Sequence, residues 1–149
     1  MTIRSFIHSK LKRAKAIALL DSGAMENFMN LQCAKHLQLP IWHLKEPRKL
    51  YNVDRSPNCS GELQYFTDLQ VQTGTQCPTL HFFLSDLGEN KAILGYPWFI
   101  AFQPRIDWRK GWIDHSQLLV ILRAPNVTKV QFLPCQINKP KTLNADKYT

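Results

Sequence analysis

The chain has 149 residues, enough for one domain of ordinary size with a short extension. An apolar content of 44% supports a buried core and argues against a disordered chain. The formal net charge of +8 admits a polyanionic partner, but Lys and Arg are scattered, and the one local excess falls in the first 15 residues. We interpret this excess as a solvated arm, and we do not expect nucleic acid to bind this domain.

The cysteines and the hydropathy pattern exclude several other classes of protein. The four cysteines are widely spaced and include no C-x-x-C pair. We therefore expect no metal, no other cofactor and no obligatory disulfide. No run approaches the roughly 20 apolar residues of a membrane span, and residues 1–15 lack the apolar centre of a signal peptide. These features favour an intracellular, cytoplasmic location without a membrane partner.

The first third of the chain centres on a short apolar run. Residues 1–14 are predicted to be a basic N-terminal arm with one weak strand near residues 3–7. Residues 16–20 are an apolar run of strand length that stops at Asp21-Ser22-Gly23. A short helix is expected over residues 31–38, because Asn30 is a good N-cap and Pro40 ends the segment.

The middle of the chain has the pattern of β-hairpins. Two short strands are expected at 41–44 and 48–53, separated by Glu46-Pro47. Residues 54–61 are almost all turn formers and predict a projecting hairpin tip. Apolar residues then alternate over 63–71 and again over 80–84, which predicts two paired strands.

A second apolar run, residues 92–94, also stops at a glycine, Gly95. A proline at position 97 suits the first turn of a short helix that reaches residue 102. Residues 104–114 are predicted to be a closing hairpin. Extra strands are expected at 118–122 and 127–132, followed by a tail over 134–149.

Asp21 has two possible roles. A carboxylate at the end of a buried strand is costly, because removing a charge from water is unfavourable. Asp-Ser-Gly also opens turns in many proteins, so these residues alone leave a turn role and a catalytic role open.

The ordered set of motifs resembles the retropepsins, the aspartic proteases that act as homodimers. The resemblance is closest to the protease segment of gypsy-class (Metaviridae) retrotransposon Gag-Pol polyproteins, and it covers about residues 15–114. The segments that carry it are Asp21-Ser22-Gly23-Ala24, Asn27-Phe28, Leu39-Pro40, Asn52-Val53-Asp54, Asp86-Leu87-Gly88, Ile93-Leu94-Gly95, Pro97-Trp98 and Pro104-Arg105-Ile106-Asp107-Trp108.

The resemblance implies a mainly β protein. The expected fold is a retropepsin-like closed β-barrel (the acid protease fold) with two short helices, forming one lobe of a homodimer. The protease domain would span residues 15–114, with residues 115–149 as a C-terminal extension and linker. The implied function is that of an aspartic endopeptidase that cleaves a polypeptide substrate, a retrotransposon polyprotein.

The resemblance also assigns roles to individual residues. Asp21 would be the catalytic residue, and the second carboxylate would come from the partner copy, since the chain has one Asp-Ser-Gly. Ser22, Gly23 and Ala24 would support the active-site loop. The flap and substrate-binding residues would be Asn52, Val53, Asp54, Arg55 and Ser56, and the second apolar-glycine loop would be Ile93, Leu94 and Gly95.

Two alternatives remain open. The first is a catalytically silent, domesticated retropepsin-like domain that acts in assembly or peptide binding. Met25 stands where relatives usually carry Thr or Ser, Glu26 adds a charge near Asp21, and Arg55 and Pro57 leave the flap tip without its own glycine. The second is a basic nucleic-acid-binding module, which the lack of a zinc knuckle and of a basic, aromatic strand disfavours.

Overall fold

The computed structural model describes residues 1–51, 57–113 and 119–125. The predicted flap residues 52–56 and the predicted strand at 127–132 lie outside this range. The elements of the described part are β1 (Thr2–His8), β2 (Arg13–Leu20), β3 (Asn27–Asn30), α1 (Leu31–His36), β4 (Trp42–Tyr51), β5 (Pro57–Thr73), β6 (Thr79–Ser85), β7 (Ala92–Leu94), α2 (Tyr96–Phe102), β8 (Ile106–Asp107), β9 (Trp112–Ile113) and β10 (Leu119–Arg123).

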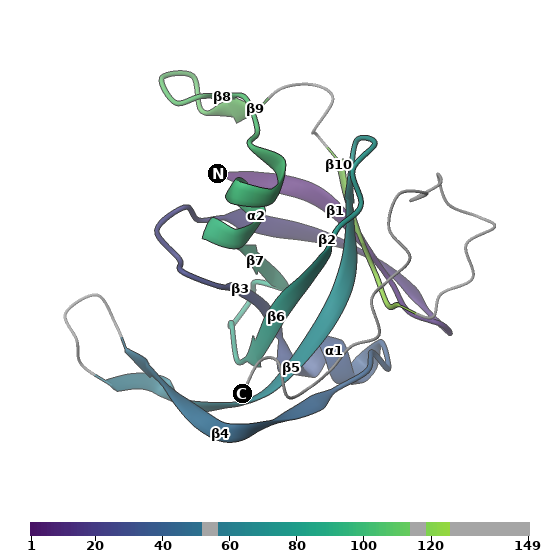
Figure 1. The fold of residues 1–149 in the computed structure, drawn as a ribbon, viewed down its shortest axis with the longest axis vertical. Helices are drawn as coiled ribbons and strands as arrows, with labels where there is room; N and C mark the ends of the chain where they lie inside the picture. Colours follow the sequence, from purple (N-terminus) through teal and green to yellow (C-terminus); the bar gives the residue numbers. More distant parts are fainter. Residues whose placement is uncertain (52–56, 114–118, 126–149) are drawn as a thin grey trace.

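Seven of these strands form one closed barrel (Figure 1). The order around the barrel is β10-β1-β2-β7-β3-β6-β5, and a pairing between β10 and β5 closes it. The barrel is mixed, because β1–β10, β2–β7 and β3–β6 are parallel pairs and the other pairs are antiparallel. This architecture, with its two short helices, confirms the predicted fold class.

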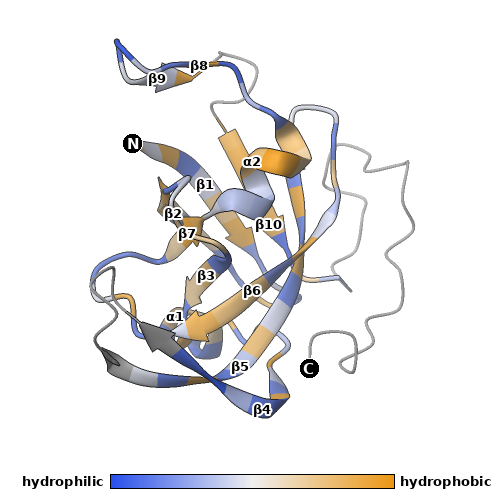
Figure 2. Ribbon diagram, turned by 60° about the vertical axis from the view of Figure 1, so that its left-hand side comes forward, coloured by the Kyte–Doolittle hydropathy of each residue, from blue (hydrophilic) through white to orange (hydrophobic). Residues whose placement is uncertain are grey.

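The core fills the inside of the barrel and the space beneath α2. Figure 2 shows apolar residues along β6 and α2, whereas β4 is largely hydrophilic. Close packing of these apolar side chains excludes water from the inside of the barrel and stabilises the fold through the hydrophobic effect. The largest fully buried apolar side chains are Trp98, Phe66, Phe82, Phe83, Ile7, Met29, Leu69, Leu94, Leu122, Val71 and Val120.

The β4–β5 hairpin extends beyond the barrel (Figure 1). β4 pairs with β5 alone, with irregular register between His43 and Arg48 and again between Lys49 and Tyr51. The two strands predicted here are therefore one strand. Pro47 lacks the N–H that a regular ladder requires, and the strand accommodates it as an irregularity instead of ending there.

Both helices begin and end as their sequences suggest. The Asn30 side chain caps α1 by accepting hydrogen bonds from the backbone N–H groups of Gln32 (3.0 Å) and Cys33 (3.3 Å). The α1 segment then stops before Gln38, whose φ of 57° is left-handed. α2 has Pro97 in its first turn and ends at Gln103, also left-handed with φ of 43°.

The two segments predicted to flank the protease domain, residues 1–14 and 115–149, each contribute a strand to the barrel. Residues 2–8, predicted as part of a basic arm, form β1, which pairs with β2 and β10. Residues 119–123, assigned to the C-terminal extension, form β10 and close the barrel. The barrel therefore includes strands on both sides of residues 15–114. Ile3, Ser5 and Ile7 of β1 are buried, whereas Thr2 and Arg4 are exposed.

The structure also gives the state of two cysteines. Cys77 is disulfide-bonded, whereas Cys33 is a free, half-buried thiol whose pKa is raised by burial. The sequence did not indicate this disulfide, and such bonds are uncommon in a reducing compartment. Within residues 1–51, 57–113 and 119–125, no helix is long and apolar enough to cross a membrane.

His8 is a buried titratable group at the end of β1, with 5% of its surface exposed. Burial lowers the pKa of His8 to about 4, and the nearby positive charges of Arg13 and Arg123 act in the same direction. The barrel therefore holds this imidazole in its neutral form at neutral pH.

The stability of the barrel should fall as the pH falls from about 6.5 to about 4. In this window the unfolded chain binds a proton at His8 and the folded chain does not, so the free energy of unfolding decreases by up to about 1.4 kcal/mol per pH unit. Urea unfolding of wild type and His8→Gln at several pH values measures the effect. An equally steep pH dependence in His8→Gln would show that other groups cause the loss.

Candidate active site

Asp21 directly follows β2, at the point where β2 runs beside β7. The two strands are parallel, with Leu20 opposite Leu94. Their carboxyl ends therefore meet at one edge of the barrel, and the Asp21 loop lies beside Gly95. The backbone N–H of Asp21 donates to the Leu94 carbonyl at 3.0 Å, which joins the two loops at their start.

The Asp21 loop is a tight turn closed by its own side chain. Oδ1 of Asp21 accepts the N–H of Gly23 at 3.0 Å, and the Asp21 carbonyl accepts the N–H of Ala24 at 3.1 Å. Asp86 accepts the N–H of Gly88 in the same way at 2.9 Å. This hydrogen bond is therefore a property of Asp-x-Gly turns. It does not by itself distinguish a catalytic aspartate.

The junction with the second loop distinguishes Asp21 from Asp86. The buried Asn27 side chain accepts the N–H of Gly95 through Oδ1 at 2.8 Å, and its Nδ2 donates to the His81 carbonyl at 3.4 Å. The Ala24 carbonyl accepts the N–H of Tyr96 at 2.8 Å. The loop after β2 and the loop after β7 are thus held together at several points.

Gly95 lets these two loops approach closely. A Cβ at this position would collide with the backbone carbonyls of Glu26 and Ala24, the latter at 2.8 Å. Gly23 is less restricted, because its Cβ would meet Asp21 Oδ1 at 3.3 Å. The requirement for glycine at the end of β7 is therefore one of space.

Three other carboxylates, Asp68, Asp86 and Asp107, have structural roles. Asp107 accepts the backbone N–H groups of the hairpin turn that follows it, and Asp86 closes its own turn. Asp68 is fully buried, with Oδ1 at 3.0 Å from Nδ1 of His81. Asp21, by contrast, is exposed at the joined loops. In the part of the chain that the structure describes, no group of three His, Cys, Asp or Glu side chains could hold a metal ion.

The structure brings together the two predicted loops, the Asp21 loop and the loop after β7. Asp21, Ser22 and Gly23 are exposed, whereas Ala24 is half-buried. The predicted flap residues Asn52, Val53, Asp54, Arg55 and Ser56 all lie outside the described residues. The hairpin that carries them extends to the side of the barrel on which the β2–β3 loop lies (Figure 1). Ile93, Leu94 and Gly95 form the end of β7 and the second loop.

The sequence alone did not indicate that Asn27 supports the site. Asn27 belongs to the Asn27-Phe28 match, and its side chain is fully buried and joins the two loops. The available signal was its position, because a polar residue directly before a buried strand segment needs hydrogen-bond partners.

A closed barrel with one Asp-Ser-Gly loop joined to a second apolar-glycine loop defines a retropepsin-like protease domain. The family model described as the PEG10/RTL1 protease domain matches residues 17–119, more than half of the chain, and the chain belongs to this family. Among solved structures, the retroviral protease-like domain of Ddi1 from Leishmania major is similar, with 16% identity, coverage of 90% of this chain and 95% of that chain, and a TM-score of 0.46. No curated protein sequence matches the chain.

Asn27→Ala should loosen the junction of the two loops. The substitution leaves the N–H of Gly95 buried without its acceptor, which costs about 1–3 kcal/mol. Urea unfolding measures this loss, and faster amide exchange at Gly95 would locate it. Asn90→Ala, at an exposed asparagine before β7, is the matched control and should change stability by less than about 0.5 kcal/mol. Equal effects of the two substitutions would contradict the assigned role.

Proposed function

We propose that the chain is an aspartic endopeptidase that hydrolyses peptide bonds in a homodimeric active site. The observation that carries the proposal is the position of Asp21, whose loop is fixed by Leu94 and by the Asn27–Gly95 junction while its side chain stays exposed. A rigidly held loop with an accessible carboxylate suits general acid–base chemistry, because the reacting group must be both positioned and reachable.

The chemistry requires two carboxylates that share one proton. The ionised carboxylate takes a proton from a water held between the pair, and that water attacks the peptide carbonyl carbon. The protonated carboxylate gives its proton to the carbonyl oxygen, so the charge of the tetrahedral intermediate stays low. Protonation of the amide nitrogen then allows the C–N bond to break. The β4–β5 hairpin would cover the substrate and exclude bulk water.

A second copy of the chain would supply the second carboxylate. Apolar residues are exposed beside the Asp21 loop, with Met25 at 74%, Tyr96 at 48% and Ile100 at 53%. Tyr96 and Ile100 are four residues apart and share a face of α2, and the Tyr96 backbone bonds to Ala24. Such a surface suits burial against an identical copy across a two-fold axis. Exposed Ser22 would then be available to the partner loop.

A retrotransposon polyprotein of the gypsy class is the substrate that we propose for this enzyme, because the motif order resembles that of such proteases. We also retain an intracellular, cytoplasmic location as part of the proposal. Membership of the PEG10/RTL1 family supports the protease origin.

The second candidate function is that of a catalytically silent domain for assembly or peptide binding. Met25 supports it, because this exposed side chain stands directly after Ala24 where relatives usually carry a hydroxyl. In this case the dimer and the peptide cleft would persist without hydrolysis.

Asp21→Asn should abolish hydrolysis of an unfolded polypeptide in mildly acidic buffer, because the amide can neither take nor share the proton. Wild-type activity should show a bell-shaped pH profile, because activity requires that the two coupled Asp21 carboxylates share one proton. Asp86→Asn is the matched control, since it changes a carboxylate in the same type of turn away from the loop junction. It should retain activity.

The outcomes separate the two candidate functions. Full activity in Asp21→Asn would exclude the aspartic mechanism. If neither wild type nor variant cleaves, while both dimerise and bind a peptide mimic with a central hydroxyl, the silent-domain candidate is supported.

Ile100→Glu should weaken dimerisation by at least about tenfold, because burial of this exposed side chain against a partner is worth about 1.5–3 kcal/mol and a charge would reverse that gain. Sedimentation across a dilution series gives the dissociation constant. Leu11→Glu is the control, because Leu11 is 73% exposed but lies in the β1–β2 turn. A larger effect of Leu11→Glu would place the interface elsewhere.

A further inference from the structure

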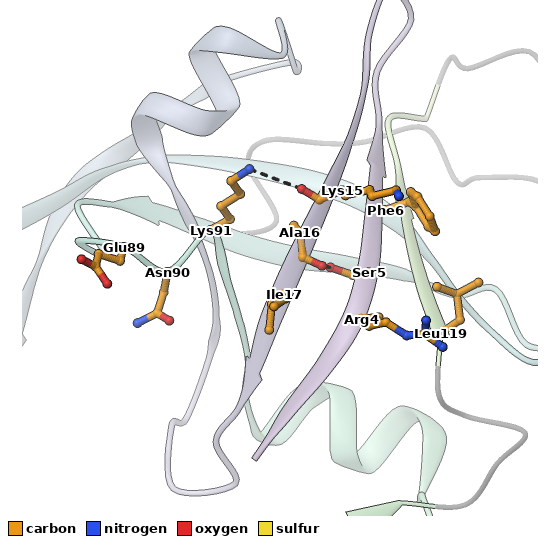
Figure 3. Close-up of a pocket in the computed structure, with 10 residues that line it drawn as sticks. All are labelled: Arg4, Ser5, Phe6, Lys15, Ala16, Ile17, Glu89, Asn90, Lys91 and Leu119. Carbon is orange, nitrogen blue, oxygen red and sulfur yellow. Dashed lines mark hydrogen bonds between the residues drawn. The ribbon is translucent and has the colours of Figure 1, made fainter.

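A groove lies outside the barrel, away from the Asp21 loop (Figure 3). It has a volume of about 820 Å³ and runs across the outer faces of β1 and β2, between Leu119 at the start of β10 and the turn before β7. Ile17, within it, precedes Asp21 by four residues, or about 13 Å along a strand. The groove is thus separate from the candidate active site.

Strand alternation places apolar and cationic side chains side by side on this face. Arg4 lies opposite Ile17 on β2 and opposite Leu119 on β10, which forms one cross-strand row. Two residues further along β1, Phe6 lies opposite Lys15 in the next row. Side chains in such rows are about 5 Å apart, so one extended segment could contact both kinds.

The apolar part of the face is accessible. Ile17 is 61% exposed and Leu119 is 41% exposed, although both lie on barrel strands. Beneath them, the hydroxyl of Ser5 donates to the Ala16 carbonyl at 2.9 Å. The floor therefore has its buried polar groups satisfied, and its affinity for a ligand would come from apolar contact.

The rim of the groove is positively charged. Arg4 and Lys15 face outward from the strands, and Lys91 reaches across to donate to the Lys15 carbonyl at 3.3 Å. Glu89 is the one carboxylate against these three cations in the lining. Within the described residues, neither Arg4 nor Lys15 forms an ion pair.

We propose that this groove binds an acidic, extended polypeptide segment of another protein, in which every second side chain faces the groove and these side chains are by turns carboxylate and apolar. The carboxylates meet Arg4, Lys15 and Lys91, and the apolar side chains pack on Ile17 and its neighbours. Charge complementarity and the two-residue alternation of the face together select this ligand. The proposal does not depend on catalysis.

Other occupants fit the groove less well. Residues 126–149 carry four lysines and one aspartate, so their charge has the same sign as the rim. A second copy of the chain, at net charge +8, meets the same repulsion. A single-stranded nucleic acid would gain from aromatic faces for stacking, and the one aromatic side chain in the lining, Phe6, is half-buried.

Fluorescence anisotropy with a short labelled peptide of repeating Glu-Ser-Leu-Ser, which presents Glu and Leu on the same face when extended, tests the proposal. The probe should bind the Asp21→Asn protein, which cannot cleave it under the proposed mechanism, and added salt should weaken binding. Arg4→Glu should lower the affinity about tenfold. Ile17→Ser should lower it for this probe, yet leave unchanged the weaker binding of a peptide of repeating Glu-Ser-Ser-Ser.

Matched controls separate this site from general attraction to a basic protein. Arg109→Glu makes the same charge change on the exposed β8–β9 turn and should leave binding unchanged. Thermal melting confirms that each variant is folded. Equal weakening by Arg109→Glu and Arg4→Glu, or equal binding of a peptide of repeating Lys-Ser-Leu-Ser, would overturn the proposal. Because no readout is hydrolysis, its failure is distinguishable from failure of the protease assignment.

Discussion

The structure depends on the contact between two loops that follow neighbouring parallel strands. β2 and β7 each finish with an apolar run, and each is followed by a loop that contains glycine. Their backbones approach so closely that Gly95 can carry no side chain. The cost of placing polar backbone groups in this tight space is offset by hydrogen bonds that Asn27 Oδ1 and the Leu94 and Ala24 carbonyls accept from backbone N–H groups. The position of Asp21 follows from these contacts.

β2 contributes to the core, to the groove and to the candidate active site. Its inward residues, such as Ala18, are buried in the core, and its outward residues, Lys15 and Ile17, lie in the groove. Its last residue leads directly into Asp21. Since the side chains of a strand alternate between two faces, one short segment can serve packing and recognition without conflict. A ligand in the groove would touch the strand that carries the candidate catalytic loop.

The sequence predicted the parts of this fold that depend on local signals. The runs ending at Asp21 and Gly95, the cap at Asn30 and the two short helices each follow from nearby residues. Long-range pairing was harder to predict. β10 was assigned to an extension because nothing near residue 119 indicates that its partner lies at residue 4. β4 was divided at Pro47 because the sequence does not show that β5 keeps the strand together. The role of Asn27 depends on Gly95, which is distant in sequence.

The pairing of β1 with β10 has a consequence for how the chain folds. Arg4 and Leu119 are partners in this parallel ladder, so the barrel cannot close until almost all of its residues have been made. Until then β1 and β5 are edge strands with unsatisfied backbone groups, open to pairing with other chains. Such long-range contacts slow folding, because a large loop must close before they form. A nascent or truncated chain without residues 119–123 is therefore expected to be prone to aggregation.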